Sequence, residues 1–551
     1  MDGFIPAEKK ILEFHGCPWH GCPKCELDRN RTNNDGKTME MLYQDTVARI
    51  KNFTDRGFTV QETWSCEWRA RVRDSPELKN YVEERARYYR HLDFVGPCNI
   101  REALSGGRTN NVKFFAEAND DEEICYADVT SLYPFVLKTK NYPLGHPTVV
   151  REDFDYSLEK YFGFVKCTVI PPRNLYLPCL PRKSCKKLMF PLCSACADQK
   201  HHGECMHSEN ERAITQTWTT EELKLALKMG YVIKTIYEVL HYSRQSDELF
   251  RPYIDMFLKI KQQASGFPSW AQTEEQKKQY IENFLMKEGI ELEMDKIIYN
   301  NALRTIAKLF LNSLWGKFAQ RDNMPQTRIL TKYQNYMEIA CNEDLRICGE
   351  IMVNPNTMII NYEHISAENA RQSDTSPAIA SFVTSYARLE LYKHMTCVER
   401  LYPNGLLYFD TDSVIYKKKT NLENLPYFGD YLGDLTNEIS EYGPGARGKL
   451  FCSLGPKMYG LTVEKSDGSL VTTVKAKLRL TAEATEIVNF GKMMEMARAY
   501  VEGIQLRHSV KQLQIRANKN HQIFSCYLTK VFRATSDKRQ VVGNETLPYG
   551  Y

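Results

Sequence analysis

Apolar and polar positions alternate in ways that predict both strands and helices along this chain. The run at 407–416, Leu-Tyr-Phe-Asp-Thr-Asp-Ser-Val-Ile-Tyr, places strand-forming residues on both sides of two aspartates, which predicts a tight hairpin. The run at 124–128 alternates like a second strand and leads into a turn. Further helices are predicted at 41–56, 219–229, 249–264, 301–320 and 379–391, and further strands at 58–64 and 231–240.

The predicted helix at 301–320 has an informative distribution of side chains. Polar and aromatic residues recur at i, i+4, i+8 and i+11 and therefore share one face: Arg304, Lys308, Asn312 and Trp315. A second face is apolar and is expected to pack inward: Ile306, Phe310 and Leu314. The cationic stripe suits either a triphosphate or simple solvation. The segment 321–375 has little periodicity and predicts an irregular insertion.

Composition is that of an ordinary globular protein. The 551 residues are 42% hydrophobic and 26% charged, and this length predicts about three or four domains. No run of about eighteen apolar residues occurs, so we expect no membrane span, and the first residues lack the pattern of a signal peptide. An intracellular protein is therefore expected, in which 17 cysteines are reduced thiols or metal ligands.

Charge is unevenly distributed. The net charge is only +4, but residues 501–551 alone contain eight Lys and Arg against three acidic residues, a net charge of +5. Such a segment is typical of a contact to a nucleic-acid backbone or of a solvated surface, and charge does not separate the two.

Two groups of cysteines have spacings typical of zinc sites. The first group is Cys17, Cys22, Cys25 and Cys66; the second is Cys193, Cys196, Cys205 and His207. The alternative is that either group consists of buried free cysteines.

Carboxylates occupy the tip of the predicted hairpin and the end of the predicted strand before it. Asp410 and Asp412 flank the hairpin turn, and Asp128 ends the strand at 124–128. Divalent cations prefer such oxygen ligands, and the turn after Asp128 offers backbone donors for a phosphate. Aspartates are also common at turns for purely structural reasons.

Together these stretches resemble the family B DNA polymerases, in the protein-primed, organellar and viral branch that includes Polinton/Maverick-type transposons. The resemblance covers about residues 100–551. It is carried by Asp128-Val-Thr-Ser-Leu-Tyr-Pro134, Lys308-Leu-Phe-Leu-Asn-Ser-Leu-Trp-Gly316, Asp410-Thr-Asp-Ser413 and Lys457-Met-Tyr459, in the family's order. It implies an α+β right-hand polymerase with palm, fingers and thumb that adds dNTPs to primer–template DNA, with a terminal protein as a further candidate partner.

The resemblance also implies roles for individual residues. Asp128 and Asp412 would bind two Mg²⁺ ions, with Asp410 as a supporting catalytic carboxylate. The nucleotide would be bound by Val129, Ser131, Leu132, Tyr133, Arg304, Lys308, Asn312 and Trp315, with Tyr133 excluding a 2′-hydroxyl. The DNA would be bound by Gly106, Gly107, Arg108, Lys457 and Tyr459.

The first residues resemble very-short-patch-repair endonucleases and related restriction-type nucleases. The run Phe-His-Gly-Cys-Pro-Trp-His at 14–20 and the Trp-Ser-Cys-Glu at 64–67 carry this likeness. It implies a metal-supported nuclease centre near Asp2, Glu13, His15 and His20. A zinc-bound remnant without nuclease activity is the alternative.

The two resemblances imply an order of parts, with two departures from the polymerase pattern. Trp315 replaces a tyrosine, and Lys475-Ala-Lys-Leu478 has Leu in place of Gly. The family's exonuclease domain has no room in this sequence, which suggests a truncated copy. The expected parts are a truncated endonuclease-like zinc module at 1–70, a helical linker at 71–120, palm at 121–240 with the Cys/His insertion, fingers at 241–320, the insertion at 321–375, palm at 376–450 and thumb at 451–551. The rival functions are a nuclease and an inactive nucleic-acid-binding remnant.

Overall fold

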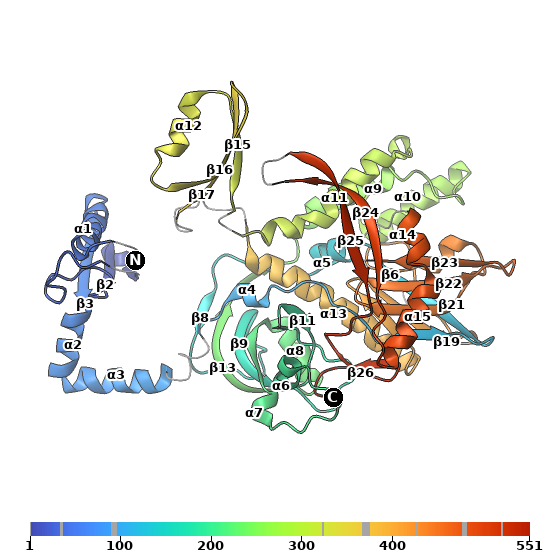
Figure 1. The fold of residues 1–551 in the computed structure, drawn as a ribbon, viewed down its shortest axis with the longest axis horizontal. Helices are drawn as coiled ribbons and strands as arrows, with labels where there is room; N and C mark the ends of the chain where they lie inside the picture. The colour runs from blue at the N-terminus through green and yellow to red at the C-terminus, as the bar shows by residue number, and fades with distance from the viewer. Residues whose placement is uncertain are drawn as a thin grey trace. The chain divides into compact units, whose positions relative to one another are not determined.

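Two structural units, Met1–Gly96 and Pro97–Tyr551, make up the chain. The computed structural model describes residues 2–32, 37–89, 96–321, 324–365, 375–425, 428–476, 482–518 and 522–551. Each unit mixes helices and strands, as the coloured ribbon in Figure 1 shows. They are described separately below.

The first unit contains a small sheet in the order β1-β2-β3. Its β2 and β3 are parallel, and the connection between them contains helix α1. The helix predicted at 41–56 and the strand predicted at 58–64 are thereby confirmed. Its elements are β1 (Gly3–Ile5), η1 (Pro6–Glu8), β2 (Lys10–His15), α1 (Met39–Asp55), β3 (Thr59–Trp64), α2 (Ser65–Asp74) and α3 (Pro76–Tyr89).

A central sheet organises the second unit, with strands in the order β23-β22-β21-β6-β19-β18-β4. Two short strands join it at the side: β20 pairs with β6, and β5 pairs with β21. The strands are β4 (Thr109–Asn111), β5 (Phe115–Glu117), β6 (Glu122–Val129), β18 (Leu406–Asp410), β19 (Ser413–Lys419), β20 (Leu435–Asn437), β21 (Arg447–Gly455), β22 (Met458–Glu464) and β23 (Leu470–Lys475).

The middle of this sheet is buried on both faces. Every residue of β18 before Asp410 is buried, and so are the first four residues of β19. This is why their sequence is a continuous apolar run and does not alternate. Helices α5 (Leu132–Thr139) and α13 (Pro377–Leu401) pack together, and α13 also contacts β18 and β19. The helix predicted at 379–391 is the N-terminal half of α13, which continues for ten further residues.

A lateral sheet in the order β12-β9-β13-β8 lies in the same unit and carries the second cysteine group in its connections. The helix predicted at 219–229 and the strand predicted at 231–240 are confirmed as α8 and β13. The elements of this region are α4 (Ile100–Ala103), β7 (Tyr142–Leu144), β8 (Thr148–Val150), β9 (Gly163–Ile170), β10 (Arg182–Ser184), β11 (Lys187–Met189), α6 (Ser194–Gln199), α7 (Glu209–Arg212), β12 (Ile214–Thr219), α8 (Thr220–Lys228), β13 (Val232–His241) and β14 (Arg244–Ser246).

Helices α9 (Arg251–Gln263), α10 (Glu274–Glu288) and α11 (Asn301–Phe318) follow, with a short turn η2 (Met294–Lys296) between α10 and α11. The predicted inward face of α11 is wrong for two of its three residues, whereas Leu314 does pack against the core. Ile306 and Phe310 are 50% and 45% exposed, whereas Ala307 and Leu311 are buried. The buried residues lie beside the cationic stripe, and α11 packs against α9. Phe310 instead stacks on Phe257 of α9, at 4.7 Å between ring centroids.

The segment predicted to be irregular at 321–375 is in fact a small folded insertion. It contains β15 (Gln326–Leu330), α12 (Tyr333–Ala340), β16 (Leu345–Asn354) and β17 (Thr357–His364), with the sheet order β15-β17-β16. Its own core contains Leu330, Ile339, Ile360 and Tyr362. The residues of β16 alternate between half-buried and exposed as far as Met352, but none is fully buried, and the strand has two register shifts against β17.

The last part of the chain returns to both sheets. It contains η3 (Glu438–Tyr442), α14 (Ala482–Ile487), α15 (Phe490–Val501), the long hairpin β24 (His508–Ala517) and β25 (Ile523–Phe532), and the short hairpin β26 (Gln540–Val542) and β27 (Glu545–Leu547). Among the helices of the described residues, none is both long and apolar enough to cross a membrane.

Candidate active site

The hairpin β18–β19 turns at Asp410-Thr411-Asp412. Asp410 pairs with Ser413 across the turn, and Thr411 has a left-handed backbone with φ of 54°. A β-branched residue is strained in this conformation, at a cost of about 1–3 kcal/mol, and strain of this kind is often stored at functional sites. The amide of Thr411 donates to the carbonyl of Arg108, at 2.8 Å, which holds the turn from outside the hairpin.

Asp128 lies next to this turn because β6 pairs with β19. Ser413 is the register partner of Asp128, and the amide of Val129 donates to the carbonyl of Asp412 at 2.7 Å. The three predicted carboxylates, Asp128, Asp410 and Asp412, therefore come together at one edge of the central sheet, although Asp410 is separated from Asp128 by nearly three hundred positions in the chain.

Burial and mutual repulsion perturb these carboxylates. Burial, followed by the charges of Asp412 and Glu438, raises the pKa of Asp128 to about 8. Burial and then the charge of Asp410 raise the pKa of Asp412 to about 6. Like charges held together in a partly desolvated place are relieved by cations, so this donor set fits divalent metal ions. Glu438, which begins η3 beside β20, was not identified from the sequence.

Asp410 has a different environment from the other two carboxylates. The ammonium of Lys457 contacts both of its carboxylate oxygens, at 2.9 and 3.1 Å. Lys457 occupies the β21–β22 turn with φ of 61°, and its amide donates to the hydroxyl of Tyr408 at 2.7 Å. Tyr459 is buried, and its hydroxyl lies 2.9 Å from that of Tyr126. Lys457 therefore reaches the turn at 410–412, whereas Tyr459 supports it from the sheet.

The turn after Asp128 opens helix α5. Ser131, the residue before this helix, has φ of 55°, and Leu132 is buried in the core. Tyr133 stands in the first turn of α5, and its ring stacks on that of Trp315 from α11, with 5.0 Å between centroids. Two predicted nucleotide-binding residues from distant parts of the chain thus form one aromatic platform.

Cations from α9 and α11 lie opposite the carboxylates. The ammonium of Lys261 is 3.4 Å from the Ser131 hydroxyl. Burial, followed by the charges of Lys308 and Arg304, lowers the pKa of Lys261. The charge of Lys308 also reaches Asp128, where it opposes the rise in pKa. Arg304, Lys308 and Lys261 therefore form a positive cluster beside the negative one, while Asn312 on the same helix is exposed.

Lys261 was not among the predicted residues. Its neighbour Lys259 pairs instead with Glu293 at 2.8 Å. A signal existed: Lys261 follows the buried residues Ile254 and Leu258 at i+7 and i+3, so it lies on the packed face of α9.

The loop at 105–108 does not place Arg108 on a DNA surface, which corrects the prediction for that residue. Arg108 is 2% exposed, donates to the carbonyl of Pro178 at 2.7 Å, and stacks over the ring of Phe190 at 4.1 Å. A side chain at Gly107 would approach the Thr411 hydroxyl to 2.7 Å, so a glycine is required there for packing against the turn at 410–412. Gly106 is exposed.

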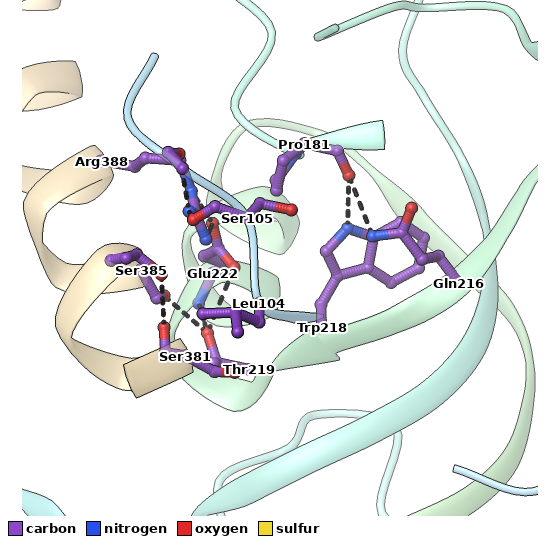
Figure 2. Close-up of polar contacts among 12 residues, drawn as sticks. Leu104, Ser105, Pro181, Gln216, Trp218, Thr219, Glu222, Ser381, Ser385 and Arg388 are labelled. Carbon is purple, nitrogen blue, oxygen red and sulfur yellow. Dashed lines mark hydrogen bonds and ion pairs between the residues drawn. The ribbon is translucent and has the colours of Figure 1, made fainter. Parts of the chain in front are cut away.

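A buried ion pair holds the loop at 105–108 in place. Figure 2 shows Arg388 of α13 pointing toward Glu222 of α8 and toward the backbone of the loop. The nitrogens of Arg388 lie 2.8 Å and 2.9 Å from the Glu222 carboxylate, and both side chains are 2% exposed. Arg388 also donates to the carbonyls of Ser105, at 2.5 Å, and Gly106, at 3.1 Å. Nothing in the sequence pattern identified this pair.

The two cysteine groups come together as metal-binding sets. In each group, one ligand atom from every residue lies within 4.8 Å of the others. We call Cys17, Cys22, Cys25 and Cys66 the first cluster, and Cys193, Cys196, Cys205 and His207 the second cluster. In the second cluster, Nδ1 of His207 lies 3.6, 3.2 and 3.7 Å from the three sulfurs. Ligands about 2.0–2.3 Å from a tetrahedral ion are separated by similar distances, so the donor sets fit zinc.

The four residues of the nuclease resemblance also lie near one another in the first unit. The rings of His15 and His20 are 4.9 Å apart. Asp2 accepts a backbone hydrogen bond across the sheet, and Glu13 pairs with Arg49 at 3.3 Å. His15 is fully buried. These groups are thus largely engaged in contacts within the unit.

Comparison with known proteins identifies the class. The family described as DNA polymerase type B, organellar and viral, matches residues 97–272 and 267–400, which is more than half of the chain. This chain therefore belongs to that family. The match includes Asp128 and the α11 cations.

Two curated proteins are similar over part of their length. A probable DNA polymerase of Neurospora intermedia is 25% identical over 364 residues, covering 64% of this chain and 30% of that protein. A DNA polymerase of Kluyveromyces lactis is 26% identical over 236 residues, covering 42% of this chain and 18% of that protein. The chain thus spans less than a third of the length of these relatives.

Among solved structures, Phi29 DNA polymerase complexed with primer-template DNA gives a TM-score of 0.47 at 17% identity, covering 81% of this chain and 66% of that one. Phi29 DNA polymerase complexed with single-stranded DNA also gives 0.47, at 18% identity, covering 79% and 61%. These TM-scores are too low for the likeness to decide the fold.

Proposed function

We propose that this chain catalyses template-directed addition of dNTPs to a primer, as a DNA-directed DNA polymerase. The observation that carries the proposal is the pairing of two charge clusters at one edge of the central sheet. Asp128 and Asp412 repel each other in a partly buried place, while Lys308 and Lys261 face them from the helices. Phosphoryl transfer depends chiefly on such positioning and charge neutralisation.

Asp128 and Asp412 would hold two Mg²⁺ ions, with the carbonyl of Val129 as a further ligand. When bound, the ions supply charge neutralisation at the transferred phosphate and lower the pKa of the attacking hydroxyl. Asp410 forms an ion pair with Lys457, so it would support the site from nearby and would not itself hold the ions. Because Lys457 is paired with Asp410, the carboxylates of Asp128 and Asp412 are the two that would remain available to the metal ions.

The nucleotide would bind between the two clusters. Lys308, Arg304 and Lys261 attract the triphosphate, and the backbone amides after Val129 supply further donors. The stacked rings of Tyr133 and Trp315 form an apolar wall where the sugar and base would lie. We infer that Tyr133 excludes a 2′-hydroxyl, because a ring at this position leaves no room beside the sugar.

The parts of the fold then receive names as part of the proposal. The central sheet is the palm, helices α9–α11 are the fingers, and the segment containing α14, α15 and the β24–β25 hairpin is the thumb. Primer–template DNA would contact Lys457 and the positively charged residues at 501–551. In the organellar and viral branch, a protein hydroxyl is a further candidate primer, and the replicated molecule would be a mobile or viral-type element.

Both cysteine clusters are proposed to bind zinc in structural roles. The first cluster joins the residues before α1 to α2, and the second joins the connections of the lateral sheet. Four sulfur or nitrogen ligands leave no open coordination position, which is the pattern of a structural site. The first unit is proposed as an endonuclease-like zinc module whose nuclease activity has not been retained.

Primer extension by the Asp412→Asn variant tests the polymerase proposal. The variant keeps the shape of the side chain but loses a charge that the metal ions require, so we expect at least a 1,000-fold loss of extension with DNA affinity retained. Asp467→Asn, in the turn between β22 and β23, is the matched control and should be fully active.

Three results would oppose the proposal. Extension within tenfold of wild type would remove Asp412 from the site. A wild-type chain that binds primer–template but never extends it would favour the nucleic-acid-binding alternative. Cutting of unprimed duplex that is lost in His20→Ala would favour the nuclease.

A further inference from the structure

The second cluster shares its core with a distant segment, residues 540–551, which we call the strap. The buried core around the cluster contains Tyr549 together with its cysteines, and Tyr549 is 1% exposed. The amide of Leu192 donates to the carbonyl of Tyr549 at 2.8 Å, and the amide of Gly203 donates to the side chain of Gln540 at 2.9 Å. One face of the cluster is therefore closed by the strap.

The strap comes closest to the second cluster at Gly550. Its φ is 87°, and a side-chain carbon built there would lie 2.3 Å from Cβ of Cys193 and 2.7 Å from its backbone nitrogen. No residue with a side chain fits without moving one of these groups. Because Cys193 is a ligand of the cluster, the position of the strap backbone and the position of a ligand are linked directly.

The other part of the strap is anchored to the central sheet. The amide of Thr546 donates to the carbonyl of Val112 at 2.7 Å, and its hydroxyl donates to the carbonyl of Asn111 at 2.7 Å. Asn544 exchanges hydrogen bonds with Phe115 through its side chain. These partners belong to β4, β5 and the residues that join them, and β4 pairs with the strand that ends at Asp410.

The region that holds the cluster has little regular structure of its own. Between β11 and β12 its only regular elements among the described residues are the short helices α6 and α7. Three of its cysteines are core residues, so without a metal the core would consist largely of thiols packed against Tyr549. Small domains of this kind usually depend on the metal for folding.

We propose that metal binding at the second cluster and docking of the strap are coupled, so that the cluster acts as a clamp between the lateral sheet and the edge of the central sheet beside β18. This rests on the zinc binding proposed above. Coupling is reciprocal: the strap raises the affinity for the metal by the same factor by which the metal stabilises the docked strap. The clamp would hold the edge strand β4 in place next to the catalytic turn.

Hydrogen exchange on the wild-type chain tests the coupling without any substitution. The protein is compared with two bound zinc equivalents and after removal of zinc by a chelator under reducing conditions. When zinc is removed, we expect the hydrogen-exchange protection factors of the amides in residues 544–551 to fall at least tenfold. The amides of β6 and β19 should stay protected. Unchanged protection of the strap would overturn the proposal.

A pair of glycine variants provides the second test. Gly550→Ala should weaken one zinc equivalent by about 10- to 100-fold, as changes next to metal ligands commonly do. Gly543→Ala is the matched control, because Gly543 also has a positive φ, of 56°, but nothing lies within 4 Å of its built side chain. The first cluster, in the other unit, is an internal reference whose zinc affinity should not change.

Wild-type affinity for both zinc equivalents in Gly550→Ala would overturn the proposal, and so would equal weakening by Gly543→Ala. A second cluster that binds no zinc would overturn it as well. None of these measurements uses DNA synthesis, so failure of the clamp and failure of the polymerase proposal are distinguishable.

Discussion

Replacement of Asp128 by Asn should remove activity and yet stabilise the metal-free fold. The pKa of Asp128 is raised from an ordinary value near 3.8 to about 8, so the folded state binds its proton more tightly than the unfolded state does. Ionisation therefore opposes folding: stability falls as pH rises from the unfolded pKa, near 4, to the folded pKa, near 8. Asn resembles the protonated side chain and does not have this penalty.

The size of the effect follows from the pKa difference. A one-unit pKa difference is worth about 1.36 kcal/mol, so at pH 8 the upper limit is about 6 kcal/mol. Asp128 is partly exposed and shares its repulsion with Asp412, and solvent screening reduces the expected gain to about 1–3 kcal/mol. Activity should still fall by several orders of magnitude, since the missing charge is needed for metal binding.

Thermal unfolding at pH 5 and pH 8, with and without Mg²⁺, measures this directly. Without Mg²⁺, Asp128→Asn should unfold at a higher temperature than wild type at pH 8, and the gap should shrink at pH 5. Added Mg²⁺ should stabilise wild type and close the gap, because a ligand stabilises only the state that binds it. A variant that is less stable at pH 8, or a gap that does not depend on pH, would refute the electrostatic reasoning.

Three further predictions concern neighbouring groups. Arg388→Met leaves Glu222 charged and buried, so unfolding should be easier by about 3–5 kcal/mol, and the added change Glu222→Gln should restore much of this in thermal unfolding; no restoration would mean that the pair is not the cause. Tyr133→Val should raise ribonucleotide incorporation more than it lowers dNTP incorporation, and an unchanged ratio in single-nucleotide extension would remove Tyr133 from sugar selection. Lys261→Ala should raise KM for dNTP at least tenfold, whereas Lys259→Ala, which breaks only a surface pair, should change it less than twofold.

Local patterns were sufficient for the elements of the site. The apolar runs around Asp410-Thr-Asp412 predicted a hairpin, and β18 and β19 form one, because short strands buried on both faces leave a continuous signal in the sequence. The spacing of apolar and polar positions within short segments likewise predicted the helices α9 and α11 and the strand β6. Cysteine spacing predicted two sets of candidate metal ligands, and in each set the ligand atoms lie within 4.8 Å of one another.

Relations between distant segments were decided only by the tertiary structure. The sequence did not reveal that Arg108 is buried, because a Gly-Gly-Arg run has the same composition whether it faces DNA or the core. It placed the apolar face of α11 wrongly, because Ala307 carries a weak hydrophobic signal but permits close packing. The folded insertion at 326–364 was missed because four of the five residues of β15 are exposed and β16 has no fully buried residue, so the apolar signal of these strands is weak.

The sequence by itself therefore determined which residues carry charge, thiols and aromatic rings, and which short segments become strands and helices. The tertiary structure decided which of these groups meet. It placed Lys261, and not Lys259, beside the hydroxyl of Ser131. It also paired Arg388 with Glu222 and packed Gly550 against Cys193. The physical reason is that secondary structure follows from interactions among near neighbours, whereas desolvation and pairing of charges depend on burial created by residues hundreds of positions away.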